Sequence, residues 1–154
     1  KTVGQMGAIM ASGSGSSGTT IEINGGSIKS NTVAIYHPES GSLKVNGGYI
    51  EGTTAIYIKC GTIELNGGEI KATASSKTNY QYKSNGCMHT GDAVVIDACN
   101  YPDKNPVVAI SGGKYSVTAA NAYGIAHYMY NGNSAIITNT TSVNVYEEAI
   151  AAQA

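Results

Sequence analysis

The sequence predicts an all-β protein, a β-solenoid of about six coils with three short strands in each coil. Two repeated phrases carry this prediction. The first has the form strand, corner, strand, and reads I-E-I-N-G-G-S-I-K at 21–29, L-K-V-N-G-G-Y-I-E at 43–51 and I-E-L-N-G-G-E-I-K at 63–71. The second is A-I-Y, at 34–36 and again at 55–57. A repeating unit of about 20 residues cannot bury its own apolar face, so successive units must stack on one another.

Each copy of the first phrase divides into two strands around a sharp corner. In I-E-I the two isoleucines point to one side and Glu22 to the other, as the period of two in a strand requires. Asn and Gly accept the left-handed conformation that a tight corner needs. The tract from Ala11 to Thr20, almost entirely Ser, Gly and Thr, is expected to be a flexible turn. Further copies of the first phrase are predicted at 108–116 and, weakly, at 136–143, and further A-I-x strands at 93–95, 124–126 and 149–151.

Outward charges alternate in sign from coil to coil. They read Glu22, Lys44, Glu64 on one sheet and Lys29, Glu51, Lys71 on the next. Because stacked strands lie about 4.8 Å apart, each charge faces the opposite sign above and below. The same logic pairs Lys59 with Asp97 on the A-I-x sheet as an exposed ladder. A further ladder, of side-chain amides, is predicted at one corner from Asn24, Asn46 and Asn66.

Composition excludes several classes of partner. The 154 residues carry a net charge of -1, and only 12% of them are charged, so no basic field recruits nucleic acid. No apolar run approaches the roughly 18 residues of a membrane-spanning helix, so we expect no membrane insertion. The chain begins and ends within repeat units, and we expect a single domain over 1–154 that is part of a longer protein. The open ends of an uncapped solenoid favour end-to-end self-association.

The N-G-G-x-I and A-I-Y phrases resemble the right-handed parallel β-helix of the pectate-lyase type, in the form found in secreted and wall-attached proteins of Gram-positive, often gut-dwelling bacteria. The resemblance covers nearly the whole chain and implies an extracellular location. Helices of this type host polysaccharide lyases, glycoside hydrolases, adhesins and phage tailspikes. The fold alone therefore does not choose a function.

The repeat is interrupted twice. The spacing of 21 residues between Ala34 and Ala55 grows to 38 between Ala55 and Ala93, which places one insertion near 73–91, and a second lies near 100–106. We expect the two insertions to rise on opposite sides of the A-I-x sheet and to frame a groove. Loops on a rigid scaffold are where binding residues gather. The expected groove floor consists of outward Tyr36, Tyr57, Lys59, Val95 and Asp97. The alternative is that both insertions are surface excursions without a ligand.

The favoured function is a non-catalytic binding module, an adhesin or a carbohydrate-binding domain, that takes a glycan or a host or cell-surface protein in this groove. Tyrosine suits such a role because it offers a flat apolar ring and a hydroxyl group. The aromatic content consists of 11 Tyr, with no Trp or Phe. A structural spacer in the stalk of a surface protein is an alternative. The predicted ligand-binding residues are Tyr36, Tyr57, Lys59, Tyr80, Tyr82, His89, Tyr101 and Asp103.

A polysaccharide lyase or glycoside hydrolase with its site in the same groove is the other alternative. Glycoside hydrolysis needs two carboxylates roughly 5–10 Å apart, and the lyases of the resembled family use an Arg base that this chain lacks. If the protein is an enzyme, the candidate catalytic residues are Asp92, Asp97, Asp103 and Lys59.

Metal and redox chemistry are weakly indicated. His37 and His127 occupy equivalent positions three coils apart, about 14 Å by the strand spacing, which is too far to share a metal ion. We expect no cofactor; calcium at Asp92 and Asp103 is a further alternative. Cys60 and Cys99 end A-I-x strands in neighbouring coils, so any disulfide should join these two. The other reading is that the thiols stay reduced.

Overall fold

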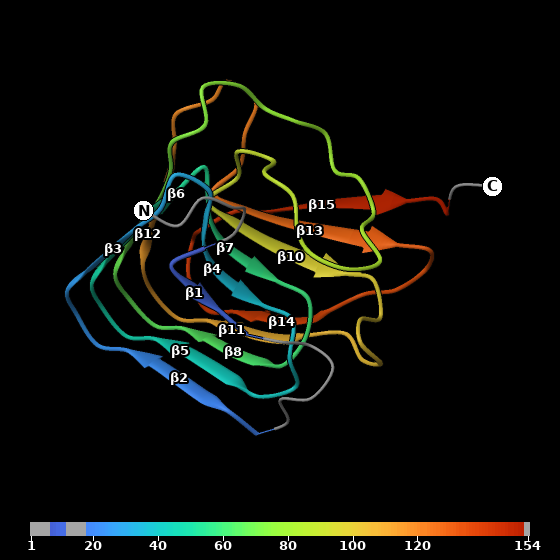
Figure 1. Ribbon diagram of the computed structural model, residues 1–154, viewed down its shortest axis with the longest axis horizontal. Coiled ribbons are helices and arrows are strands. Elements are labelled where there is room, and N and C mark those ends of the chain that lie inside the picture. Colours follow the sequence, from blue (N-terminus) through green and yellow to red (C-terminus); the bar gives the residue numbers. More distant parts are fainter. Residues whose placement is uncertain (1–6, 12–17, 153–154) are drawn as a thin grey trace.

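The computed structural model describes residues 7–11 and 18–152 and forms a parallel β-helix (Figure 1). Three parallel sheets run along the molecule, and each takes one strand from successive coils. The described residues contain no helix, and so none that could cross a membrane. The predicted fold class is confirmed. Most of the Ser, Gly and Thr tract at 11–20 lies outside the described residues.

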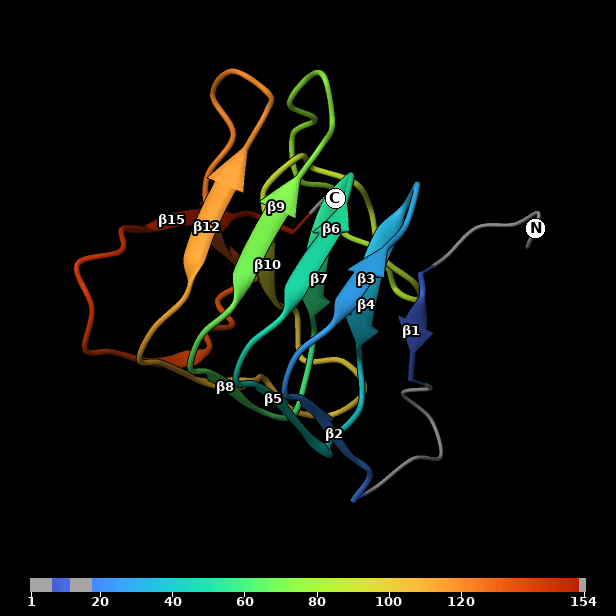
Figure 2. The ribbon, with the colours of Figure 1, turned by 90° about the vertical axis from the view of Figure 1, so that its left-hand side faces the viewer.

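The strands are distributed over the sheets as follows. Sheet A, the A-I-x sheet, contains β1 (Ile9–Met10), β4 (Val33–His37), β7 (Thr54–Ile58), β10 (Val94–Ala98), β13 (Ile125–Tyr130) and β15 (Val145–Ile150). Sheet B contains β2 (Thr20–Ile23), β5 (Ser42–Val45), β8 (Thr62–Leu65), β11 (Val107–Ile110) and β14 (Ile136–Asn139). Sheet C, which faces the viewer in Figure 2, contains β3 (Ser27–Lys29), β6 (Tyr49–Gly52), β9 (Glu69–Ala72) and β12 (Lys114–Val117).

The interior is a column of aliphatic side chains that repeat from coil to coil. Leu43, Ile63 and Val108 are register partners on sheet B, and all three are buried. Ile50 and Ile70 are likewise register partners on sheet C, and both are buried. Removing these faces from water is the main favourable contribution to folding, because a single coil could not bury them alone.

The Asn-Gly-Gly corner brings the backbones of neighbouring coils into close contact. A Cβ added at Gly67 would lie 2.6 Å from the carbonyl oxygen of Asn46, so only glycine fits there. The second glycine of each corner has a positive φ, such as 91° at Gly68, which side chains rarely adopt. The asparagine ladder is confirmed. Asn66 donates to Asn46 and Asn46 donates to Asn24, both at 2.8 Å, and Ser111 continues the ladder by donating to Asn66.

The predicted charge registers on sheets B and C are confirmed, but only one of the two ladders contains an ion pair. On sheet B, Glu22 pairs in register with Lys44 and Lys44 with Glu64, and the last two lie 3.3 Å apart. On sheet C, Lys29, Glu51 and Lys71 are register partners as predicted. Within the described chain these three form no ion pair. Glu51 instead accepts a hydrogen bond from Tyr49.

The last coil departs from its predicted register. Ile125 pairs with Val145 and Ala126 with Tyr146, so the equivalent of A-I-x begins near 144 and not at 149–151. The predicted copy at 136–143 supplies only β14, and no sheet C strand follows it among the described residues. Without that strand the chain reaches sheet A after fewer residues, which explains the shift.

We predict that Gly67→Ala lowers the free energy of unfolding by about 1–3 kcal/mol, because its methyl group must displace a neighbouring backbone. Gly25 is the matched control. It occupies the same place in the first corner, and an added Cβ there meets nothing within 4 Å. Gly25→Ala should therefore change stability by less than about 0.5 kcal/mol. Urea unfolding followed by circular dichroism measures both, and equal losses would contradict the stacking explanation.

Candidate binding site

The first insertion lies over the outer face of sheet A. It connects β9 to β10, and Figure 1 shows it (green to yellow-green) leaving the coils, running toward the carboxyl ends of the sheet A strands and returning to β10. On the outward path the rings of Tyr80 and Tyr82 stack on Tyr128 and Tyr130 of β13, with centroids 4.9 and 4.1 Å apart. On the return path His89 contacts Thr53 through a side-chain hydrogen bond. The insertion is therefore a cover for this face.

Beneath this cover lies a second hydrophobic core, outside the coil interior. The expected groove floor is part of it: Tyr36 is 3% exposed, and Tyr57, Lys59, Val95 and Asp97 are completely buried. The prediction of an open groove on this face is wrong. The physical reason is that the insertion carries its own apolar surface and buries it against the sheet. The buried members of this second core are Val33, Tyr36, Tyr57, Tyr80, Met88, Val95, Ala126 and Tyr128.

Asp97 lies at the centre of the covered face. Its carboxylate accepts hydrogen bonds from the hydroxyls of Tyr57 at 2.8 Å and Tyr80 at 2.6 Å. Burial raises the pKa of this carboxyl, against the opposing effect of the two hydroxyls. It also raises the pKa of both tyrosines, so the hydroxyls stay protonated and act as donors.

Lys59 does not form the exposed pair with Asp97 that was predicted. Both residues are buried, and no ion pair joins them in the described chain. The Lys59 ammonium donates to the carbonyl oxygen of Lys83 at 2.7 Å and lies 4.8 Å from the ring centroid of Tyr101. Lys59 therefore holds both insertions against the sheet, and the charge of Asp97 is offset by tyrosine hydroxyls.

Asp92 anchors the start of β10 through four donor groups. Lys77 donates to both of its oxygens at 2.6 and 2.7 Å. The Thr90 and Tyr128 hydroxyls and the Tyr123 backbone N–H complete the set, all within 2.8 Å. Asp92 is fully buried and Lys77 partly so. This network ties the insertion, β10 and β13 together at one point.

The two insertions meet each other and do not frame a groove between them. The Tyr101 hydroxyl donates to the side chain of Asn85 at 3.3 Å. Asp103 is exposed on the second insertion, beyond the carboxyl end of β10, whereas Asp92 precedes the amino end of that strand. Of the predicted ligand-binding set, Tyr36, Tyr57, Lys59 and Tyr80 are buried, His89 and Tyr101 are half-buried, and Tyr82 and Asp103 are exposed.

This arrangement also corrects the catalytic and calcium alternatives for the same groove. Asp92, Asp97 and Lys59 are buried with their polar atoms engaged, so they cannot face a substrate as a pair. Asp92 and Asp103 lie at opposite ends of β10 and cannot share a calcium ion. No group of three or more His, Cys, Asp or Glu side chains suited to a metal ion occurs in the described ranges.

The predicted Cys60–Cys99 disulfide is not formed, and both residues are free thiols. Burial raises the pKa of Cys99 to about 12 and that of Cys87 to about 11. At neutral pH these groups are protonated and therefore poor nucleophiles.

One hollow lies at the margin of the cover on sheet A. It has a volume of about 140 Å³ and is lined by Lys77, Asn79, Tyr80, Asn121, Tyr123, Tyr128, Tyr146 and Glu148. The rings of Tyr123 and Tyr146 stack in parallel at 3.7 Å. The Tyr146 hydroxyl donates to Glu148 at 3.0 Å, and this bond is the main cause that raises the pKa of Tyr146 to about 12. We call this site the tyrosine hollow.

The amides of the tyrosine hollow are uncommitted. Asn79 and Asn121 are exposed, and neither side chain makes a hydrogen bond within residues 7–11 and 18–152. The Lys77 ammonium, in contrast, is held by Asp92 and by the Tyr128 hydroxyl at 2.6 Å. The hollow thus combines stacked aromatic rings, two available amides and one half-buried carboxylate.

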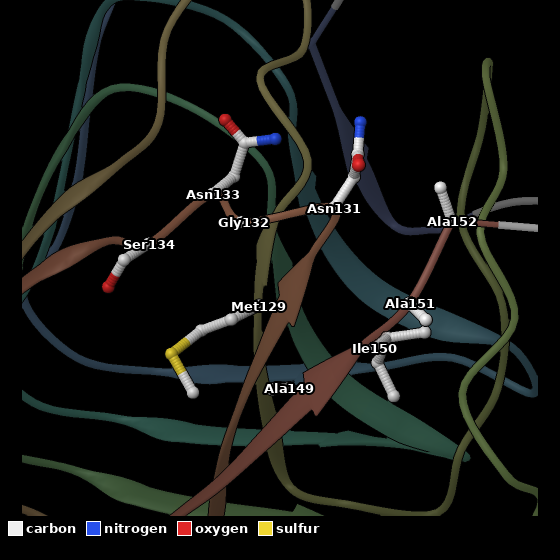
Figure 3. A pocket seen from close by; sticks show the side chains of 9 residues that line it. All are labelled: Met129, Asn131, Gly132, Asn133, Ser134, Ala149, Ile150, Ala151 and Ala152. Carbon is white, nitrogen blue, oxygen red and sulfur yellow. The ribbon is translucent and has the colours of Figure 1, made fainter.

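A larger hollow of about 570 Å³ lies at the carboxyl ends of β13 and β15, and Figure 3 shows its lining. In Figure 3 the side chains of Asn131 and Asn133 point to one side of the lining and that of Ser134 to the other. Asn133 and Ser134 are already hydrogen-bonded to backbone carbonyls. The remaining lining is mostly alanine and glycine, so this hollow offers little to orient a ligand.

Sequence reasoning missed most of the tyrosine hollow. Tyr146 and Glu148 were hidden by the wrong register of the last coil. Lys77 and Asn79 lay within the predicted insertion but carried no motif. One signal was available: Tyr80 and Tyr82 share the alternation of Tyr128 and Tyr130. Two segments with tyrosines spaced by two residues can stack ring on ring.

We predict that Asp92→Asn destabilises the fold by about 3 kcal/mol, because it leaves the Lys77 ammonium without a counter-charge in a mostly buried place. Asp103→Asn is the control, since Asp103 is exposed and makes no hydrogen bond or ion pair within the described part of the chain. It should change stability by less than about 0.5 kcal/mol. Urea midpoints that coincide for the two variants would show that Asp92 is not an anchor.

From the three buried or half-buried histidines we predict that the free energy of unfolding decreases below neutral pH. Burial lowers the pKa of His37, His89 and His127 below the ordinary 6.5. The unfolded chain therefore binds more protons just below pH 6.5, and the free energy of unfolding decreases as the pH falls through that window. His127 contributes through its Nε2 atom, which accepts the Ala135 N–H at 3.0 Å and must stay unprotonated.

His127→Gln should reduce the dependence of the free energy of unfolding on pH, by at most about 1.4 kcal/mol per pH unit. The raised pKa of Asp97 acts with the opposite sign, but it is present in both proteins and cancels in the difference. Urea unfolding of both proteins between pH 5 and 8 measures the effect. An unchanged slope would mean that His127 is not buried as a neutral ring.

Comparison of the chain with protein-family models, with curated proteins and with solved structures gives no match.

Proposed function

We propose that this protein is a non-catalytic β-helix binding module of a secreted or surface-attached protein, and that the tyrosine hollow binds a sugar unit of a glycan. The observation that carries the proposal is the combination in one hollow of the stacked Tyr123 and Tyr146 rings with the uncommitted amides of Asn79 and Asn121. A pyranose has an apolar face for a tyrosine ring and hydroxyls that both donate and accept hydrogen bonds.

The size of the hollow limits what it holds. Sites for drug-sized ligands have about 300–1,000 Å³, whereas this hollow has about 140 Å³. It therefore suits one ring, such as a terminal sugar or a branch, and the rest of the glycan extends into solvent. A site of this size binds weakly by itself, and repeated presentation of the sugar raises the overall affinity.

The carboxylates support binding over catalysis. Asp92 lies next to the hollow but is fully buried, and its oxygens are saturated by Lys77 and three other donors. Glu148 is the acidic residue that lines the hollow itself. A glycoside hydrolase that uses two carboxylates would need a second carboxylate, besides Glu148, that can reach the glycosidic bond.

A glycan array with the intact chain tests the proposal. We expect binding to a restricted set of glycans, and a loss of at least tenfold in affinity for Tyr146→Ala, which removes a ring from the hollow. Tyr82→Ala is the matched control. Tyr82 is 41% exposed and stacks on Tyr130 outside the hollow, so its loss should leave binding unchanged. An array without binding, or equal losses for the two variants, contradicts the assignment.

A further inference from the structure

The outer face of sheet C consists of polar and charged side chains that are exposed or half-buried among the described residues. Figure 2 shows its four strands side by side, with the loops after β9 and β12 projecting beyond the strand ends. Two adjoining hollows of about 680 and 330 Å³ lie over this face and over the glycine corner beside it. Both are lined by Tyr49, Glu69 and Lys114.

The charged side chains on this face form no ion pair with one another in the described residues. The side chains of Glu69, Lys71 and Lys114 make no ion pair or hydrogen bond in the described residues. Lys29 lies 5.4 Å from the ring centroid of Tyr49, and Glu51 accepts the Tyr49 hydroxyl. Sheet B differs, because there Lys44 and Glu64 form an ion pair. The alternation on sheet C therefore has no intramolecular ion pair to account for it.

We propose that the outer face of sheet C is an interface with a second copy of this chain. The sheet order is β12-β9-β6-β3, so a two-fold axis parallel to the strands can pass between β6 and β9. This axis reverses the order of the coils and keeps each residue's position along its strand. Glu51 of one copy then faces Lys71 of the second copy, and the contact occurs twice, as in an isologous dimer.

The remaining pairs on this face are also compatible. The register places Ser27, Tyr49, Glu69 and Lys114 in one row across the sheet. Under the same axis, Tyr49 faces Glu69 of the second copy, and Ser27 faces Lys114 of the second copy. No like charges oppose one another in this arrangement, so the two facing surfaces are electrostatically complementary.

The dimer is expected to be weak and sensitive to salt. Four strands at 4.8 Å spacing and four residues at 3.3 Å give roughly 250 Å² of flat area, well below the roughly 800 Å² per partner of stable complexes. Tyr49 is the one aromatic residue that lines the two hollows, and the other side chains there are polar or charged. Attraction between opposite charges is therefore expected to provide most of the binding free energy. Salt at 1 M should weaken the association at least tenfold.

Sedimentation equilibrium at protein concentrations up to 1 mM tests the proposal at low salt. We expect a monomer–dimer equilibrium that Lys71→Glu weakens at least tenfold, because Glu51 then faces a carboxylate. The double variant Glu51→Lys with Lys71→Glu exchanges the charges and should restore association. Lys44→Glu on sheet B is the matched control and should leave it unchanged. A wild-type monomer at 1 mM, equal effects of Lys71→Glu and Lys44→Glu, or no recovery in the double variant would overturn the proposal.

Discussion

The close approach of one coil to the next at the Asn-Gly-Gly corner is the constraint on which the rest of the structure depends. With glycine at Gly67 and Gly112, the backbones of neighbouring coils can touch. This contact sets the spacing at which the asparagine amides bond to each other and the strands of all three sheets pair in register. The aliphatic interior then follows, because each coil covers the apolar face of the one before it.

A regular solenoid of this kind offers rigid faces, and the two insertions decide which face stays open. The first insertion brings Tyr80, Tyr82 and Met88 onto sheet A and forms a second core there. The buried charged groups on this face are paired: Asp97 with two tyrosine hydroxyls, Asp92 with Lys77, and Lys59 with a backbone carbonyl. Such pairing is required where water is excluded, because an unpaired buried charge is strongly destabilising.

The repeat made most of the fold predictable from the sequence. The corners, the amide ladder and the charge registers at Lys44 and Lys71 follow from a repeat of about 20 residues that occurs several times in the sequence. The path of the insertion could not be obtained in this way, because 73–91 contains no copy of either repeated phrase and its tyrosines fit an exposed loop as well as a cover. The last coil was misplaced for a related reason. It lacks a sheet C strand, so counting residues put the A-I-x position five residues too late.

Because sheet A is covered, a binding site is expected at the margin of this face and not at its centre. Tyrosines that alternate along a sheet predict a binding groove only if nothing else packs on them. Here Tyr36 and Tyr57 lie in a core, and the aromatic surface that remains available is at its margin, around Tyr123 and Tyr146. Sheet C exposes charges of both signs on its outer face among the described residues.

Lysine labelling of the native protein tests most directly whether the insertion covers sheet A. Lys59 is completely buried, whereas Lys83, whose carbonyl it contacts, has an exposed side chain. Brief treatment with an amine-acylating reagent, followed by peptide mapping, should modify Lys83 and Lys104 and leave Lys59 unmodified until the protein is unfolded in urea. Modification of Lys59 at the rate of Lys83 in the native protein would show that the face is open and would contradict this account.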